Sequence, residues 1–182
     1  TGVLRGEGGF DPVTNLQFGD NSGYALSQPV TNQNFVVTPL SSIMNADGST
    51  DYDTFKTKLG LDSDYMIRFN DPFSNLGDAS LNKAAVVNTQ IAIMKSIISE
   101  LGSGSESDAE SSIATQIITR TGDETSLGDT TWTKNAITAL SSSSDDFSPS
   151  SEQLVSLSAG ISAFMQKINA NDSSNSHSHF AK

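Results

Sequence analysis

From residue 39 onward, apolar residues recur at intervals of three and four, which is the spacing that one face of an α-helix requires. The clearest stretch runs from Asp78 to Leu101. Its apolar stripe comprises Val87, Ile91, Met94, Ile98 and Leu101. The same spacing predicts shorter helices over residues 51–59, 107–120 and 130–141. Together with helices that begin at Pro39 and Pro149, the pattern predicts five or six helices around one core.

Residues that favour helix ends support these boundaries. Thr38 can cap a helix whose first residue is Pro39, because proline lacks the N–H that this position leaves unbonded. Ser148 and Pro149 repeat this pair, with Glu152 in the first turn, where a helix dipole favours an acidic side chain. We expect this last helix to end near Ala170.

The first 37 residues differ from the rest, because glycines and turn residues separate short β-prone pieces. The candidate strands are Val3–Arg5, Leu16–Phe18 and Phe35–Val37. Strands this short must pair with each other, with the helices or with another chain. We therefore predict a mainly α protein, a bundle of five or six helices with a short N-terminal β ribbon. Residues 1–37 form a junction, 38–170 the bundle, and 171–182 a polar and flexible tail.

Composition and charge argue against several classes of partner and site. The formal net charge is −11, and the ten basic residues are scattered along the 182-residue chain. Nucleic acid is therefore not an expected partner, since a phosphate-binding surface needs clustered Lys and Arg. Without cysteine there is no disulfide or thiolate zinc site. No stretch reaches the roughly 18 apolar residues of a membrane span, and we expect any export signal to lie upstream or to have been removed.

One acidic segment is a candidate for calcium. Asp47, Asp51 and Asp53 bring several oxygen ligands together, as a hard cation requires. The segment does not fit an EF-hand loop, because Ile43 and Thr54 would take the first and last ligand positions. The alternative is a turn at Asp47-Gly48 followed by acidic residues that complement the start of a helix.

A second acidic group flanks the long loop 61–77, which Tyr65, Phe69 and Phe73 are expected to anchor. It comprises Asp62, Asp64, Asn70, Asp71 and Asp78. These residues could converge on a cation, although loop carboxylates commonly serve turns and caps.

Catalytic motifs are scarce. The chain has two histidines, His177 and His179, and both lie in the polar tail, where a closed zinc site or a catalytic triad is not expected. Gly6–Gly9 lacks the Lys-Ser/Thr of a phosphate loop. Trp132 lies at helical spacing and is expected in the core. A glycosidase-like hydrolase with paired carboxylates stays open.

Several short motifs follow one another in the first hundred residues. They are GG-x-D-x-x-T (Gly8 to Thr14), VVTPLSS (Val36 to Ser42), Leu-Gly-Leu (Leu59 to Leu61), FNDPF (Phe69 to Phe73) and LNKAA (Leu81 to Ala85). In this order they resemble an uncharacterised helical module of large secreted, adhesin-like bacterial surface proteins. The chain departs from that pattern at Ser41-Ser42 and at the inserted Asn70. The resemblance implies an extracellular, non-enzymatic role.

We therefore expect a structural module of a bacterial surface or matrix protein, with copies of itself or neighbouring domains as partners. The N-terminal strand residues Val3, Leu4, Leu16 and Phe18 are the expected assembly element, because an unpaired strand edge invites another strand. Such a module could form a filament. The alternatives are a calcium-dependent adhesion or ligand-binding module and a carboxylate-based hydrolase.

Overall fold

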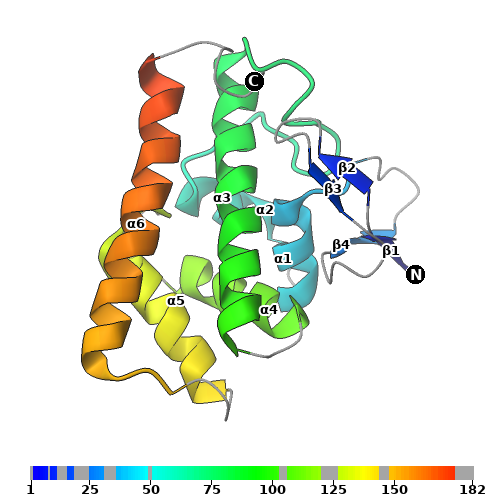
Figure 1. Ribbon diagram of the computed structural model, residues 1–182. Coiled ribbons are helices and arrows are strands. Elements are labelled where there is room, and N and C mark those ends of the chain that lie inside the picture. Colours follow the sequence, from blue (N-terminus) through cyan, green and yellow to red (C-terminus); the bar gives the residue numbers. More distant parts are fainter. Residues whose placement is uncertain are drawn as a thin grey trace.

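The fold is mainly helical, as the spacing of apolar residues predicts (Figure 1). A computed structural model describes residues 2–7, 9–11, 16–18, 25–30, 36–48, 51–102, 106–119, 127–143 and 148–174. Within these ranges the helices are α1 (Pro39–Asp47), α2 (Tyr52–Lys58), α3 (Ala79–Gly102), α4 (Glu106–Ile118), α5 (Thr130–Ser143) and α6 (Ser151–Ser174). Helix α3 runs through the middle and contacts α1, α4, α5 and α6.

The core is built on the apolar stripe of α3. Ile91, Met94 and Ile98 are fully or almost fully buried there, and Val87 is buried as well. The other helices contribute Leu40, Ile43, Phe55, Ile113, Ile117, Trp132, Ile137, Ile161 and Met165 to the same cluster. Trp132 is therefore a core residue, as predicted. Burial of this many large apolar side chains is the main term that stabilises the bundle.

The start of α6 differs from the sequence expectation. Ser150, rather than Ser148, precedes the helix: the Gln153 amide N–H donates to Ser150 Oγ, and the Ser150 amide N–H donates to Gln153 Oε1. This reciprocal pair is a capping box, which satisfies two backbone donors at once and outweighs the preference of Pro149 for the first helical position. Helix α6 also continues to Ser174, because no Gly or Pro follows Gly160 within it.

The loop between α2 and α3 packs through Tyr65, as expected, and through Ile67, which was not expected, while Phe73 is half-buried. Tyr65 and Ile67 are buried, but Phe69 is 39% exposed. Successive turns cause this, since the Tyr65 amide bonds to the Asp62 carbonyl and the Phe69 amide to the Met66 carbonyl. Phe69 is therefore not an anchor of this loop.

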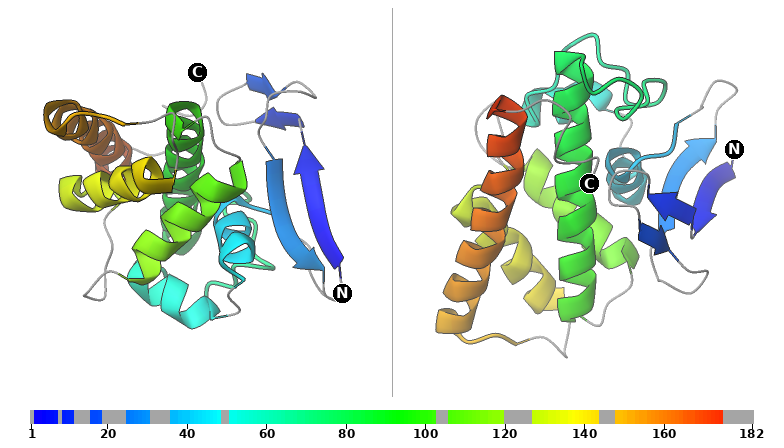
Figure 2. Two further views of the ribbon diagram at one scale, coloured as in Figure 1. Left: turned by 90° about the horizontal axis from the view of Figure 1, so that it is seen from below. Right: turned by 45° about the horizontal axis from the view of Figure 1, so that its top comes forward.

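The strands are β1 (Gly2–Glu7), β2 (Gly9–Asp11), β3 (Leu16–Phe18) and β4 (Ala25–Val30). β1 pairs with β4 and β2 with β3, both antiparallel. β4 also contacts α1, so that β1 lies on the outer side (Figure 2). Val36 and Val37 lie outside these strands, and the Val36 amide bonds instead to the Arg68 carbonyl. The division of the chain into a junction, a bundle and a tail stays a prediction.

Candidate functional site

The edge of β1 is the first candidate, because the expected assembly residues Val3 and Leu4 lie in this strand. Among the strands that the structure describes, β1 pairs with β4 alone, and its other edge is open. Leu16 and Phe18 lie in β3, in the separate β2–β3 pair. The structure thus places the four residues in two separate strand pairs.

Pro29 indicates which main-chain groups of β1 face the open edge. Val3 lies opposite Pro29 in the β1–β4 register. Because Pro29 has no N–H, Val3 and Pro29 form a non-hydrogen-bonded residue pair of the antiparallel ladder. These pairs alternate with bonded ones. The amide and carbonyl groups of Val3, Arg5 and Glu7 therefore point away from β4.

Helix α1 holds this ribbon to the bundle. Its N-cap is Thr38, as predicted: Thr38 Oγ1 accepts from the Ser41 amide, and Ser41 Oγ accepts from the Thr38 amide. The next backbone donor, the Leu40 amide, bonds at 2.9 Å to the side-chain oxygen of Asn88, which lies on α3 and is fully buried. A side chain 48 residues away therefore completes the start of α1.

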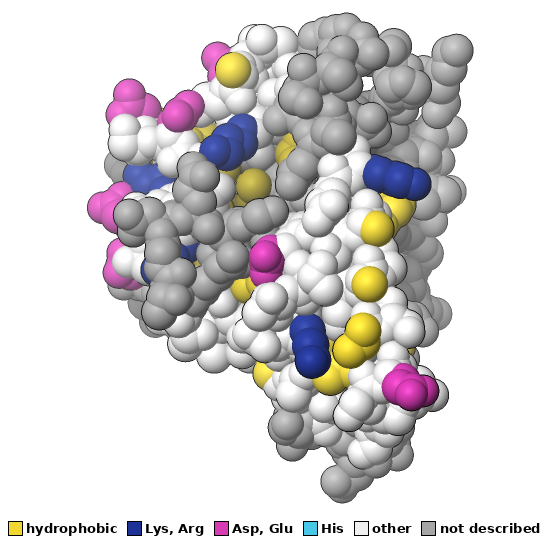
Figure 3. All heavy atoms as spheres, turned by 90° about the vertical axis from the view of Figure 1, so that its left-hand side faces the viewer, with side chains coloured by type: hydrophobic (Ala, Val, Ile, Leu, Met, Phe, Trp, Pro, Cys, Tyr) yellow, Lys and Arg dark blue, Asp and Glu magenta, His cyan; other side chains and the backbone are white. Residues whose placement is uncertain are grey.

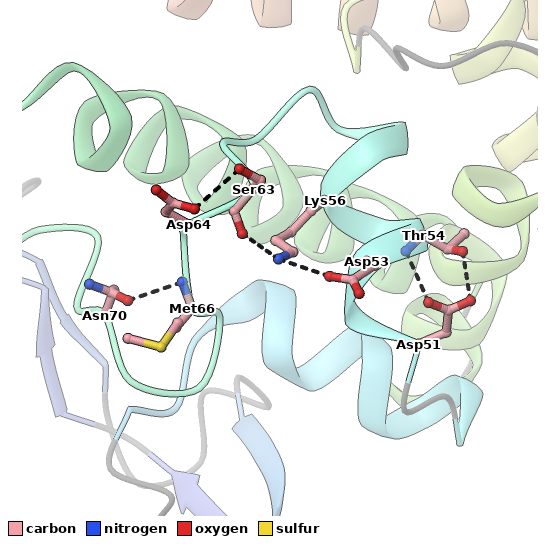
Figure 4. A network of polar contacts seen from close by, with 8 residues as sticks. All are labelled: Asp51, Asp53, Thr54, Lys56, Ser63, Asp64, Met66 and Asn70. Atoms are coloured by element: carbon pink, nitrogen blue, oxygen red, sulfur yellow. Dashed lines mark hydrogen bonds and ion pairs between the residues drawn. The ribbon is translucent and has the colours of Figure 1, made fainter.

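The segment proposed for calcium begins α2 (Figure 4). Asp51 is the N-cap, and its carboxylate accepts from the Thr54 amide at 3.0 Å and from the Thr54 hydroxyl at 2.6 Å. These hydrogen bonds lower the pKa of Asp51. Asp53 pairs with Lys56 at 2.9 Å. The Asp47 side chain lies outside the described part, so that calcium binding by the three residues stays a prediction.

Lys56 connects this helix to the following loop. Its ammonium group donates to the Ser63 carbonyl at 2.6 Å as well as to Asp53 (Figure 4). Within the same view, Ser63 Oγ donates to Asp64, and the Met66 amide donates to the side-chain oxygen of Asn70. The Lys56–Ser63 contact therefore holds the loop to α2, whereas the other two contacts lie within the loop.

The second acidic group lines an open hollow of about 420 Å³. Asp62, Asp64, Asn70 and Asp78 all border it, together with Tyr65 and Ser80. Asp78 also caps α3, since its carboxylate accepts from the Ser80 and Leu81 amides. Asp71, the fifth member, is not among the lining residues, and its carboxylate accepts from the Phe73 amide. The structure therefore brings four of these five residues to one surface.

Tyr65 forms the buried side of this hollow. Burial, reinforced by the negative charge of Asp71, raises the pKa of Tyr65 to about 12. Its hydroxyl donates to the Asn70 carbonyl at 3.3 Å. Tyr65 is thus a neutral hydrogen-bonding group at ordinary pH.

Two further observations concern metals and membranes. Within the described ranges, no group of three or more His, Asp or Glu side chains is arranged to hold a metal ion. None of the described helices is long and apolar enough to cross a membrane. His177 and His179 lie outside the described residues.

A buried ion pair that was not expected from the sequence joins α3 to α4. Lys95 Nζ lies 2.7 Å from Glu110 Oε1, with side-chain exposures of 1% and 9%. The signal that could have marked this pair is helical spacing. Lys95 lies four residues after Ile91 and three before Ile98, and Glu110 lies three residues before Ile113, and all three isoleucines are buried.

No protein-family profile, curated protein or solved structure matches the chain. The resemblance of residues 1–100 to a module of secreted surface proteins therefore stays a hypothesis that rests on its motifs.

Proposed function

We propose that this chain is a non-enzymatic structural module that assembles through the open edge of β1. The observation that carries the proposal is the position of β1, which among the described strands pairs with β4 on one side and with none on the other. Its partner strand β4 contacts α1, whose start is bound to the buried Asn88. An open edge held on a packed bundle is suited to pairing with a strand of another chain.

The location of this module is also a proposal. A place at the bacterial cell surface or in an extracellular matrix is supported by the resemblance of the first hundred residues and by the absence of cysteine from the sequence. The partner strand would belong to a second copy or to a neighbouring domain of the same polypeptide.

A proline substitution in β1 tests the open edge directly. Arg5→Pro removes an N–H that points outward and spares the hydrogen bonds to β4. We expect it to reduce assembly, measured by light scattering and electron microscopy, while the helical circular dichroism stays unchanged. Arg5→Ala is the matched control, because it removes the same side chain but keeps the N–H. Assembly of Arg5→Pro at the level of Arg5→Ala would show that the β1 edge is not used.

A calcium-dependent adhesion or ligand-binding module is the second candidate. It draws on the hollow beside Tyr65, which Asp62, Asp64 and Asp78 border, although the described carboxylates form no group of three arranged to hold a metal ion. Binding to the folded state alone would raise the melting temperature with calcium concentration. Equal melting temperatures in calcium and in chelator would exclude this function. A hydrolase would draw on the same three carboxylates and stays the third hypothesis.

A further inference from the structure

The outward face of α6 carries a strip of exposed residues that the bundle does not use. Helix α6 contacts α3 and α5 through its other face, where Ile161 and Met165 are buried. On the outward face, Val155 is 53% and Phe164 51% exposed. Figure 3 looks onto this side of the molecule and shows a line of hydrophobic side chains between a basic and an acidic group.

The members of this strip, called the outer strip, are of three kinds. Its ends are charged, Glu152 near the start of α6 and Lys167 near the end. Between them lie the two large apolar residues Val155 and Phe164. Its centre is made of small residues, Ser156, Ala159, Gly160 and Ala163, and all eight residues are exposed.

The order of these residues is symmetric about the point between Ala159 and Gly160. Counting outward from that point, Ser156 corresponds to Ala163, Val155 to Phe164, and Glu152 to Lys167. The first pair consists of two small residues, the second of two large apolar residues, and the third of two residues of opposite charge. The two charged ends lie 15 residues apart, which is about 22 Å along a helix.

We propose that the outer strip binds the outer strip of a second copy of this chain, with the two α6 helices antiparallel. In that pairing Glu152 lies at the level of the partner's Lys167, and Lys167 at the level of the partner's Glu152. The dimer therefore gains two pairs of opposite charge from one two-fold contact. A parallel pairing would instead bring Glu152 beside Glu152 and Lys167 beside Lys167.

The centre of the strip suits a close approach of two helices. Ser156, Ala159, Gly160 and Ala163 have little or no side chain, so that the helix surfaces can come together there. Val155 and Phe164 are nine residues, or about two and a half turns, apart, so they project from opposite edges of the strip. In the antiparallel pairing each lies beside the partner copy's other apolar residue and removes apolar area from water. The antiparallel direction also aligns the helix dipoles favourably.

The size of the strip sets the strength of the contact. One helix face about 22 Å long and about 10 Å wide is much smaller than the roughly 800 Å² that each partner buries in a standard stable complex. The expected dimer is therefore weak and reversible, and it forms at high local concentration. The net charge of −11 opposes it at low ionic strength.

Charge reversals measured by sedimentation equilibrium over a wide concentration series test the proposal. Lys167→Glu and Glu152→Lys each replace two attractive pairs by two repulsive ones, and each should weaken dimerisation by about tenfold or more. The double variant Glu152→Lys/Lys167→Glu restores both pairs and should dimerise like the wild type. Lys83→Glu, which reverses an exposed charge on α3, is the matched control and should leave dimerisation within about twofold.

Glu152→Lys separates pairing from general charge repulsion. It replaces one negative by one positive charge and brings the net charge from −11 to −9, which by itself would favour association. Weaker dimerisation in this variant therefore has to come from the lost pairing with Lys167.

Gly160→Leu tests the close approach. A Cβ at Gly160 would meet no atom within 4 Å, so the protomer tolerates a larger side chain. We expect an unchanged circular dichroism spectrum and loss of the dimer. The proposal would be overturned if the wild type stayed monomeric at every concentration. It would also be overturned if the variant Glu152→Lys/Lys167→Glu dimerised as weakly as the two single variants.

This contact is independent of the β1 edge, and the two can be told apart. Arg5→Pro leaves the outer strip unchanged and should dimerise through α6 like the wild type. If the β1 edge of the proposed function is also two-fold, the two contacts alternate and build an open chain of protomers. The outer-strip variants would then break that chain into pairs joined at β1.

Discussion

The buried ion pair between Lys95 and Glu110 allows the sharpest prediction about stability. The ammonium and carboxylate groups lie 2.7 Å apart, and the two side chains are 1% and 9% exposed. In Lys95→Met the Glu110 carboxylate would stay buried without its cation. We expect a loss of about 3–5 kcal/mol in the free energy of unfolding, the range seen when one partner of a buried pair is removed.

The double variant Lys95→Met/Glu110→Leu should recover most of this loss, because it removes both charges and leaves apolar groups of similar size. We expect its free energy of unfolding within about 1–2 kcal/mol of the wild type. Trp132 is the one tryptophan in the chain and is 3% exposed, so its fluorescence reports unfolding in urea. Glu110→Leu alone completes the double-mutant cycle and gives the coupling energy.

The matched control is Asp53→Asn, which removes an ion pair whose carboxylate is 89% exposed. Solvent screens that pair, so we expect almost no change in stability. The reasoning would be refuted if Lys95→Met lost less than about 1 kcal/mol, the value typical of exposed pairs. It would also be refuted if the double variant were as unstable as the two single losses added together.

Three further predictions concern single residues. Asn88→Ala should lower the free energy of unfolding by about 1–3 kcal/mol, because the Leu40 amide would be buried without its acceptor, and urea unfolding measures this. Gly128→Ala should lower the melting temperature, because a Cβ added at Gly128 would lie 2.9 Å from Cγ and 3.2 Å from the backbone nitrogen of Gln166. Gly160→Ala should raise the melting temperature, because a Cβ added there would meet no atom within 4 Å and alanine favours the helix. The pKa of Tyr65 is raised to about 12 from an ordinary value of 10.0, so the stability that the neutral hydroxyl contributes is complete below pH 10 and is lost as the pH rises toward 12. Tyr65→Phe should abolish this part of the pH dependence of the free energy of unfolding. A tyrosinate absorbance titration should show one late ionisation in the wild type that the variant lacks.

Local interactions explain why the helices could be placed from the sequence. The spacing of Val87, Ile91, Met94 and Ile98 depends only on the helical repeat, and all four are buried in the structure. The cap at Thr38 involves residues three positions apart and was likewise predictable. At α6 two local signals competed, and the Ser150–Gln153 capping box prevailed over Ser148-Pro149 because it makes two reciprocal hydrogen bonds.

Which residues come together in the candidate sites depended on contacts between residues that are distant in the sequence. The acidic residues of the 61–77 loop were identifiable by type, but which of them share a surface follows from the turns that bury Tyr65 and Ile67. β4 was not among the strands expected from the sequence, and its pairing with β1, in which Pro29 lies opposite Val3, is a tertiary contact.

By itself, the sequence determined a mainly helical chain, its helical stripes and most of its helix ends, because these follow from contacts within one or two turns. Tertiary structure alone decided which polar side chains are buried. Asn88 bonds to Leu40 across 48 residues, Gln90 bonds to the Met165 carbonyl across 75, and Lys95 meets Glu110 between two helices. It also decided that Met165 of α6 enters the core whereas the neighbouring Phe164 faces solvent. The physical reason is that a helix presents several faces of comparable pattern, and only the packing of its neighbours selects which of them is covered.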